Sequence, residues 1–133
     1  WRGLVAGVIA SALHLLPHKE EGFACIGPHI LAHSFEVGLD VRDQLVNCLK
    51  LYSPRPEDLN AFTHTAPHDS QKAFVDLQML AKYQLQAFGL SPKNCFFANV
   101  DTLTQVDWHS FRRDKNRAGR NLSICFFKGV SHL

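Results

Sequence analysis

The sequence has no long hydrophobic run, since its apolar stretches, such as residues 4–9 and 124–127, fall far short of the roughly 20 residues that a membrane span needs. We therefore expect a soluble chain. It also has no fixed repeat and only ordinary numbers of glycine (8) and proline (6), which excludes collagen-like, low-complexity and solenoid architectures. A Walker loop, a dinucleotide glycine fingerprint and a serine nucleophile elbow are missing as well, so those enzyme classes receive no local support.

Cysteine and net charge are also low. Four widely spaced cysteines without a CxxC pair predict reduced thiols in a cytoplasmic protein rather than a disulfide framework. Lysine and arginine (14) nearly balance aspartate and glutamate (12), and the net charge of +2 does not demand nucleic acid or an anionic membrane as a partner. With 46% hydrophobic residues, the 133 residues can form one packed core, so we expect a single domain over 1–133.

Apolar residues that recur every three to four positions predict helices over 4–16, 35–51 and 77–88, the last with Asp76 as its N-cap. Short apolar and aromatic runs predict strands over 23–26, 95–98 and 122–127. The proline-rich stretch 52–70 is expected to be a long connection, and 99–120 an irregular polar segment. Interleaved helices and strands favour an α/β or an α+β fold.

A basic segment is the first candidate for chemistry. Five cations lie within residues 112–120, and arginine forks on a loop can converge on phosphate or carboxylate. The alternative is a solvated surface turn whose charges bind nothing. Arg2, just before the first predicted helix, is a second candidate for an anion, and His109 is a candidate proton donor or acceptor beside such a site. Glu36 is expected to serve the N-terminus of the second helix, where a negative charge is favourable.

The histidines raise the question of a metal. His29 and His33 are four residues apart, as are His64 and His68, and this spacing brings side chains together only on a helix. Pro28 argues against a helix there, and neither pair has an obvious third ligand of the kind that zinc requires. We therefore favour polar, partly exposed loop histidines and predict no metal ligands in this chain.

Three local patterns occur in register: WRGLVAGV at residues 1–8, IGP at 26–28 leading to FEVG at 35–38, and SFRRD at 110–114 followed by GR at 119–120. In order and spacing they resemble the C-terminal half of the laccase-domain family, also called YfiH-like or polyphenol oxidase proteins. Members of that family are regarded as purine nucleoside phosphorylases with adenosine deaminase activity. The resemblance spans nearly the whole chain.

The resemblance implies an α+β fold with mixed β-sheets flanked by helices, of which residues 1–133 are the C-terminal portion. It implies a cytoplasmic enzyme that acts on adenosine, inosine and related purine nucleosides with phosphate as co-substrate. Phosphorolysis needs a cationic cradle for its nucleophile, so Arg2, Arg112 and Arg113 gain weight as phosphate or ribose-phosphate contacts, with His109 nearby.

The resemblance also implies a zinc ion held by His, Cys and His. These ligands are expected upstream of Trp1, the third in a His-Ala-Gly segment directly before Trp-Arg-Gly. We therefore expect the zinc, and the deaminase chemistry that a metal-activated water performs, to depend on the N-terminal half as a partner, and the chain alone to be inactive.

The chain departs from the family pattern at residues 29–32, at Trp108-His109 and at Val100-Asp101, which concerns loop contacts to substrate more than the fold. Two alternatives to the phosphorylase remain. A non-enzymatic binding module would use the basic loop 112–120 against an acidic partner or nucleic acid. Copper-dependent phenol oxidation is disfavoured, because the single methionine, Met79, lies in a predicted helix with no histidine close in sequence.

Overall fold

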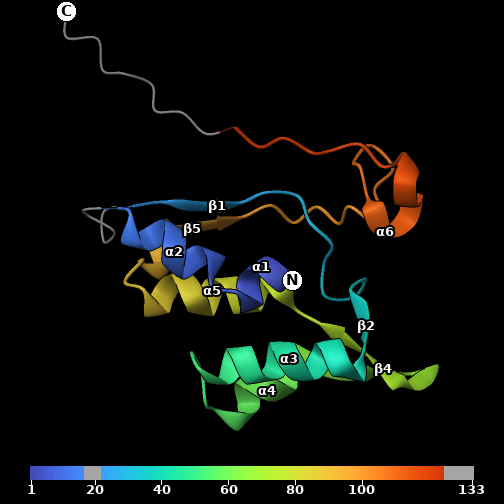
Figure 1. Ribbon diagram of the computed structural model, residues 1–133, viewed down its shortest axis with the longest axis horizontal. Coiled ribbons are helices and arrows are strands. Elements are labelled where there is room, and N and C mark those ends of the chain that lie inside the picture. Colours follow the sequence, from blue (N-terminus) through green and yellow to red (C-terminus); the bar gives the residue numbers. More distant parts are fainter. Residues whose placement is uncertain (17–21, 125–133) are drawn as a thin grey trace, which may run out of the picture.

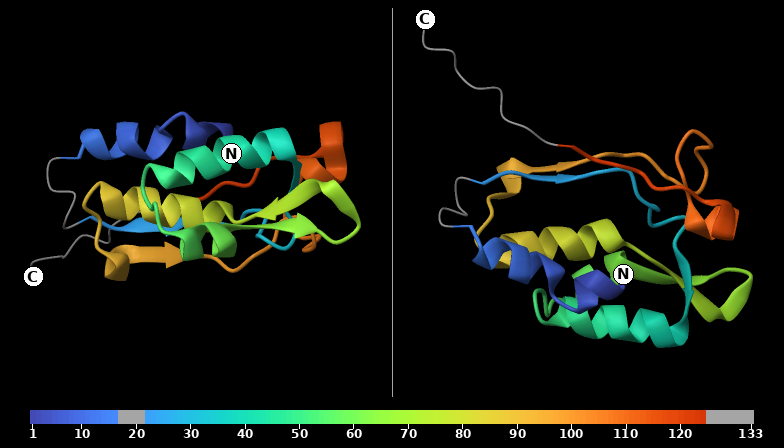
Figure 2. Two further views of the ribbon diagram at one scale, coloured as in Figure 1. Left: turned by 90° about the horizontal axis from the view of Figure 1, so that it is seen from below. Right: turned by 45° about the horizontal axis from the view of Figure 1, so that its top comes forward.

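The computed structural model describes residues 1–16 and 22–124 and has an α+β fold, which confirms the predicted class. The paired strands β1 (Ala24–Ile26) and β5 (Cys95–Phe97) lie on one side, helix α5 (Leu77–Ala87) in the middle, and helix α3 (Leu39–Lys50) on the other side (Figures 1 and 2). Within the described ranges, no helix is long and apolar enough to cross a membrane. The helices are α1 (Arg2–Val5), α2 (Val8–His14), α3 (Leu39–Lys50), α4 (Pro56–Phe62), α5 (Leu77–Ala87) and α6 (Phe111–Asp114), with 3-10 turns η2 (Pro92–Asn94) and η3 (Lys115–Arg117).

The strands form two separate sheets. Strands β2 (Glu36–Gly38), β4 (Asp69–Val75) and β3 (Thr63–Ala66) form an antiparallel sheet in the order β2-β4-β3, and β1 (Ala24–Ile26) pairs with β5 (Cys95–Phe97) in parallel. The strands predicted at 23–26 and 95–98 are thus confirmed. Residues 122–124 have no regular secondary structure, and the rest of the strand predicted over 122–127 lies outside the described residues.

The first predicted helix is wrong as a single element. Gly7 has a φ of +80° and separates α1 from α2, a left-handed conformation that glycine adopts without steric cost. The apolar stripe continues across the break, so periodicity alone cannot show it. Pro17, the expected terminator, lies outside the described residues.

Two further predictions need correction. The helix expected from residue 35 or 36 begins at Leu39, because residues 36–38 pair with β4 as a strand. The connection expected over 52–70 contains α4 and most of the β3–β4 hairpin. Pro56 stands in the first turn of α4 and fits there, since that position needs no N–H donor. The hairpin was missed because its strands bury only Ala66, Ala73 and Val75, which leaves no alternating apolar pattern.

Helix α5 connects two apolar clusters. The larger cluster joins α3, α4 and the three-stranded sheet and has Leu45, Leu49 and Leu80 fully buried. The smaller cluster holds Leu13 of α2 and Leu85 of α5 against β1 and β5. Helix α5 follows the prediction closely: Asp76 caps it by accepting from Met79 N at 2.9 Å, and Gly89, with a φ of +96°, follows its end.

Candidate functional site

Arg112 is placed by α6 at the edge of the three-stranded sheet. Ser110 caps this short helix by accepting from the Arg113 backbone N–H. Arg112 Nη1 donates to the backbone oxygen of Glu36 at 2.7 Å, and its guanidinium lies over the Phe35 ring, 5.4 Å from the ring centroid. The hydrogen bond engages Nη1 and attaches Arg112 to the start of β2 across 76 residues of sequence.

A pocket of about 300 Å³ opens beside Arg112. Its lining brings together the indole of Trp1, the carboxylate of Glu36, and the cationic side chains of Lys72 and Arg112, with apolar residues of β2 and α3 beneath them. Two cations, one carboxylate and an aromatic ring are the groups that could receive a small anionic or aromatic ligand.

Glu36 holds two side chains of the β3–β4 hairpin. Its carboxylate lies 3.0 Å from Lys72 Nζ and 2.7 Å from His68 Nε2. The hydrogen bond from Lys72 lowers the pKa of Glu36, and the same bond raises the pKa of Lys72. The predicted helix-terminal role of Glu36 is therefore wrong: Gly38 occupies the N-cap of α3, and the acid of its first turn is Asp40.

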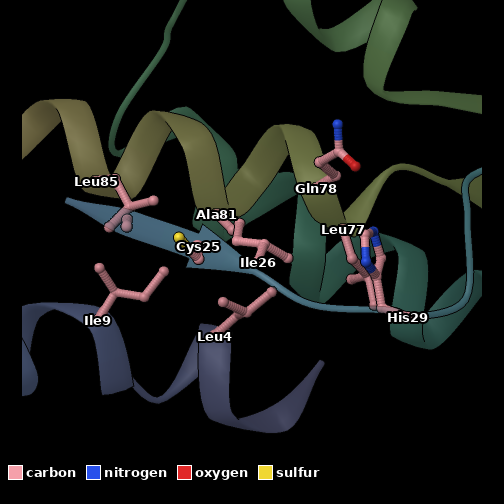
Figure 3. Close-up of a pocket in the computed structure, with 10 residues that line it drawn as sticks. Leu4, Ile9, Cys25, Ile26, His29, Leu77, Gln78, Ala81 and Leu85 are labelled. Atoms are coloured by element: carbon pink, nitrogen blue, oxygen red, sulfur yellow. The ribbon is translucent and has the colours of Figure 1, made fainter. Parts of the chain in front are cut away.

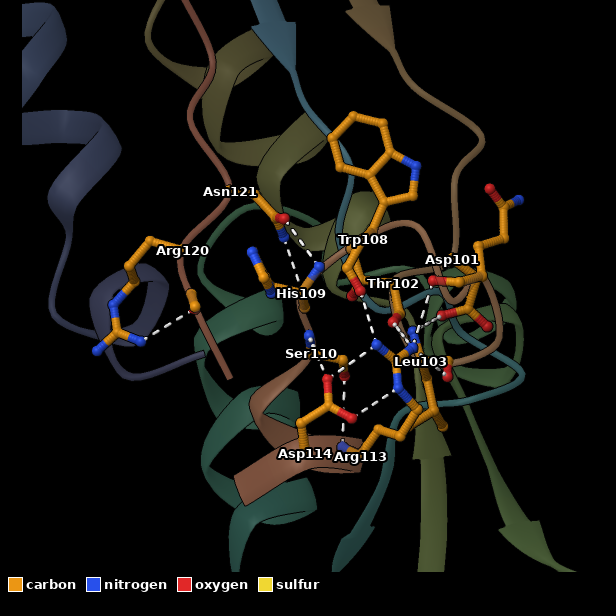
Figure 4. A network of polar contacts seen from close by, with 12 residues as sticks. Asp101, Thr102, Leu103, Trp108, His109, Ser110, Arg113, Asp114, Arg120 and Asn121 are labelled. Atoms are coloured by element: carbon orange, nitrogen blue, oxygen red, sulfur yellow. Dashed lines mark hydrogen bonds and ion pairs between the residues drawn. The ribbon is translucent and has the colours of Figure 1, made fainter. Parts of the chain in front are cut away.

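Arg113 is not among the residues that line this pocket, and its side chain fastens the loop before α6 (Figure 4). Its Nε and Nη2 donate to the Asp114 carboxylate at 2.9 and 2.8 Å, and this bond lowers the pKa of Asp114. The remaining donors reach four backbone oxygens, at 2.8–3.3 Å, of Thr102, Leu103, Gln105 and Trp108. All three nitrogens are engaged, so the geometry gives Arg113 a structural role, and its predicted phosphate contact gains no support.

The other predicted site residues lie outside the pocket lining. Arg2 lies over the Trp1 ring at 5.0 Å and so stands beside the pocket. His109 packs its ring against Gly119, so closely that an added Cβ there would come within 2.6 Å of its Nε2. Arg120 donates to its own neighbour's carbonyl. Arg112, Arg113 and Arg120 therefore have separate contacts, and these arginines of the basic segment 112–120 do not converge on one anion as predicted.

The four paired histidines also separate. His29 Nδ1 lies 2.8 Å from Gly27 O, His33 contacts Asp101, His64 stacks on Phe74 at 5.3 Å, and His68 contacts Glu36. In the part of the chain that the structure describes, no three His, Cys, Asp or Glu side chains lie close enough to hold a metal ion.

Asp101 forms a second buried polar cluster, which joins the loops after β1 and β5. It accepts from the Ser34 hydroxyl and from the backbone N–H groups of Leu31 (3.4 Å) and Leu103 (3.0 Å), and His33 Nε2 lies at 3.2 Å. Burial alone raises the pKa of Asp101, but the hydrogen bonds, led by that from Ser34, outweigh it and the pKa is lowered.

Sequence reasoning found Arg112 but missed Lys72 and Trp1 as its neighbours. Lys72 stands opposite Gly38 in the β2–β4 ladder, one diagonal step from Glu36, and cross-strand neighbours of opposite charge attract. That relation was hidden because neither strand was predicted. An FEVG segment followed by a lysine in an exposed strand is the signal that could have found it.

The sequence as a whole matches a known family. The family described as multi-copper polyphenol oxidoreductase laccase matches residues 1–128, and the chain belongs to it. This confirms the resemblance to the laccase-domain, YfiH-like proteins. Among curated relatives, a purine nucleoside phosphorylase of Pseudomonas aeruginosa is 29% identical over 96% of this chain, and purine nucleoside phosphorylase YfiH of Shigella flexneri is 31% identical over 93%.

These relatives are about twice as long. The chain spans 49% of the Pseudomonas protein and 46% of the Shigella protein. The crystal structure of the Bacillus licheniformis hypothetical protein YfiH superposes with a TM-score of 0.71 at 21% identity, over 90% of this chain and 44% of that chain. That likeness supports the fold, and the chain matches less than half of the solved one.

Proposed function

We propose that this chain, assembled with the rest of a YfiH-like fold, takes part in purine nucleoside phosphorolysis, and that the pocket beside Arg112 binds the phosphate. One observation carries the proposal: Arg112 and Lys72, 40 residues apart, reach the same 300 Å³ pocket as the Trp1 indole. The names of the two bacterial relatives support the same activity.

In this proposal the chain binds and orients the reactants. Arg112 presents its free guanidinium edge to two phosphate oxygens, and Lys72 offers a point charge to a third. The cations hold the phosphate dianion against the ribose, so that one oxygen forms a bond to C1′ while the bond from C1′ to the purine nitrogen breaks. Trp1 supplies an apolar ring against which a purine or ribose can pack. Arg2, whose guanidinium lies 5.0 Å from the centroid of that ring, is a further cation nearby.

Adenosine deamination, unlike the proposed phosphorolysis, would use a zinc ion. When bound, zinc would supply a metal-activated water for that reaction. Across residues 1–16 and 22–124 no group of three ligand side chains exists, so these residues do not fit a zinc ion. Deamination by the assembled protein would therefore depend on ligands from elsewhere, and no step of the proposed phosphorolysis uses the metal.

The test uses phosphorolysis of inosine by the assembled protein. Arg112→Ala is expected to lower kcat/KM for phosphate about 10- to 100-fold, the range expected when a hydrogen bond to a charged group is lost. Arg112→Lys should recover part of this loss, because it restores charge without the fork. Arg117→Ala is the matched control from the same basic segment and should leave the rate unchanged. Equal rates for Arg112→Ala and Arg117→Ala, or no phosphorolysis by the assembled wild type, would reject the proposal.

A further inference from the structure

Glu36 differs from the other residues at the pocket beside Arg112. Among the described residues that line this pocket, it alone has a side chain that accepts hydrogen bonds. Its Oε1 lies 3.0 Å from Lys72 Nζ and its Oε2 lies 2.7 Å from His68 Nε2, and the side chain is 22% exposed. Two partners on different oxygens hold the carboxylate in a fixed orientation at the pocket wall.

A carboxylate at this position opposes the binding of phosphate. The hydrogen bond from Lys72 lowers the pKa of Glu36, so the group is ionised at neutral pH. Its negative charge repels a phosphate dianion and offsets part of the positive charge of Lys72. A pocket that received only an anion would bind it more tightly with a neutral residue here. Glu36 therefore indicates a second ligand group, one that donates hydrogen bonds.

The carboxylate of Glu36 has acceptor capacity left for such donors. An ionised carboxylate can accept about four hydrogen bonds. In the described part of the chain, the side chains that contact its oxygens are those of Lys72 and His68, one on each oxygen. Ribose carries hydroxyl groups on the adjacent carbons C2′ and C3′, and both can donate. A pair of neighbouring donors matches a carboxylate that has a free position on each oxygen.

An apolar pocket elsewhere in the chain is a poor alternative for the sugar. It has a volume of about 400 Å³ and lies between β1, α5 and the α1–α2 segment (Figure 3). Leu4, Ile9 and Leu85 contribute to its lining, in which the described residues include no Lys, Arg, Asp or Glu. Sugar hydroxyls would lose their hydrogen bonds to water there and gain few partners. The pocket beside Arg112 offers an acceptor and two cations together.

We propose that Glu36 accepts hydrogen bonds from the C2′ and C3′ hydroxyls of the nucleoside and thereby makes the site select ribonucleosides over deoxyribonucleosides. This inference rests on the proposed phosphorolysis and assigns the sugar to the acceptor side of the phosphate pocket. Phosphate then lies on Arg112 and ribose on Glu36, which brings the attacking oxygen and C1′ together. His68 and Lys72 act on the sugar through Glu36, as positioning residues.

The test compares the phosphorolysis of inosine, 2′-deoxyinosine and 3′-deoxyinosine by the assembled protein. Glu36→Gln keeps the size of the side chain and replaces a charged acceptor with a neutral amide. We expect it to lower the preference for inosine over each deoxynucleoside, measured as a ratio of kcat/KM values, about 5- to 10-fold relative to wild type. Comparison of the same ratio in two proteins cancels the intrinsic reactivity of each substrate. The KM for phosphate should stay the same or fall, because a repelling charge is removed.

Asp69→Asn is the matched control. The pKa of Lys72 is raised chiefly by Glu36 and also by the charge of Asp69, but Asp69 lies outside the pocket lining. Asparagine keeps an acceptor for Gln71 N, so this variant removes a neighbouring charge and should leave both preferences unchanged.

Three results for Glu36→Gln would overturn the inference. They are unchanged preferences, an equal loss of rate for all three substrates, and a higher KM for phosphate with unchanged preferences, which would mean that Glu36 only positions Lys72. In each of these cases the wild type still performs phosphorolysis, and the proposed function stands. If the wild type releases no hypoxanthine from inosine in a phosphate-dependent reaction, the proposed function fails and the inference fails with it.

Discussion

The two sheets of this molecule differ in how completely they are covered. The three-stranded sheet packs against α3, α4 and α5, and Phe62 and Val75 there are each 1% exposed. In the part of the chain that the structure describes, α2 and α5 cover one face of the β1–β5 sheet, and Phe96 on the other face is 52% exposed. Among the described residues, the first region is closely packed, whereas the second leaves aromatic side chains exposed. Stability should therefore be concentrated in the first region.

The largest expected contrast is between a buried and an exposed phenylalanine. Phe62→Ala should lower the free energy of unfolding by about 3–5 kcal/mol, because it removes a fully buried ring and leaves a cavity. Phe96→Ala in the chain alone should cost less than about 1 kcal/mol, since most of its surface is already in water. Urea unfolding monitored by circular dichroism measures both. Similar costs would mean that the β1–β5 sheet is covered in solution.

Asp101 compensates for the weak pairing of β1 and β5 by joining the loops that follow them. His29 N donates to Val100 O and Thr102 N to His29 O, so the parallel pairing is extended next to this carboxylate. Asp101→Asn replaces an accepting oxygen with a donor facing the Ser34 hydroxyl. We expect a loss of about 1–3 kcal/mol at neutral pH, the cost of unsatisfied buried polar groups.

The lowered pKa of Asp101 predicts how the destabilisation by Asp101→Asn changes with pH. The pKa of Asp101 is lowered in the folded state, so its contribution to stability is present above the unfolded pKa of about 3.9 and is lost as the pH falls through the folded pKa. The difference in unfolding free energy between wild type and Asp101→Asn should therefore shrink below about pH 4. Asp107→Asn, at an exposed position, is the control and should show no such convergence. A difference independent of pH down to pH 2 contradicts the assignment.

Whether an element could be predicted from the sequence depends on whether its apolar residues follow a regular pattern. Helix α5 and the strands β1 and β5 were predictable, because their buried positions follow a clear period or form a short apolar run. The β3–β4 hairpin was not, since strand β4 buries only Ala73 and Val75 near its end. The break at Gly7 leaves the apolar stripe intact and depends on a backbone angle that composition does not reveal.

The candidate site was predictable only in part for a related reason. Arg112 was found as a member of a cationic run, but Arg112 and Arg113 are adjacent and the sequence cannot tell which of them faces the pocket. Tertiary packing distinguishes the two arginines. The guanidinium of Arg113 donates to backbone carbonyl oxygens, whereas that of Arg112 lies over the Phe35 ring. Lys72 required knowledge of the strand register, which was absent.

Removal of the cap of α5 should affect both regions, because that helix contributes Leu80 to one cluster and Leu85 to the other. Asp76→Ala should cost about 1 kcal/mol, the usual effect of losing a side-chain N-cap. Asp76→Asn keeps an acceptor for Met79 N and should recover most of that loss. Hydrogen exchange measures the result locally: faster exchange confined to one cluster would show that α5 does not couple the two regions.

An effect of about the same size as that of Asp76→Ala is expected at Gly7, which lies where the chain passes from one cluster to the other. Leu4 and Val5 of α1 pack on the larger cluster, whereas Ile9 and Leu13 of α2 belong to the smaller one. An added Cβ at Gly7 meets nothing within 4 Å, so Gly7→Ala reports only the cost of a left-handed backbone, about 1 kcal/mol of destabilisation.

Gly3→Ala provides the matched control four residues earlier. Gly3 lies within α1, and a Cβ there makes an ordinary 3.6 Å contact with Val8, so this change should stabilise the chain by up to about 1 kcal/mol through helix propensity. Thermal unfolding of the two variants should therefore shift in opposite directions from wild type. If both substitutions stabilise, α1 and α2 form one continuous helix in solution, and the two clusters are joined by a rigid rod rather than by a bend at Gly7.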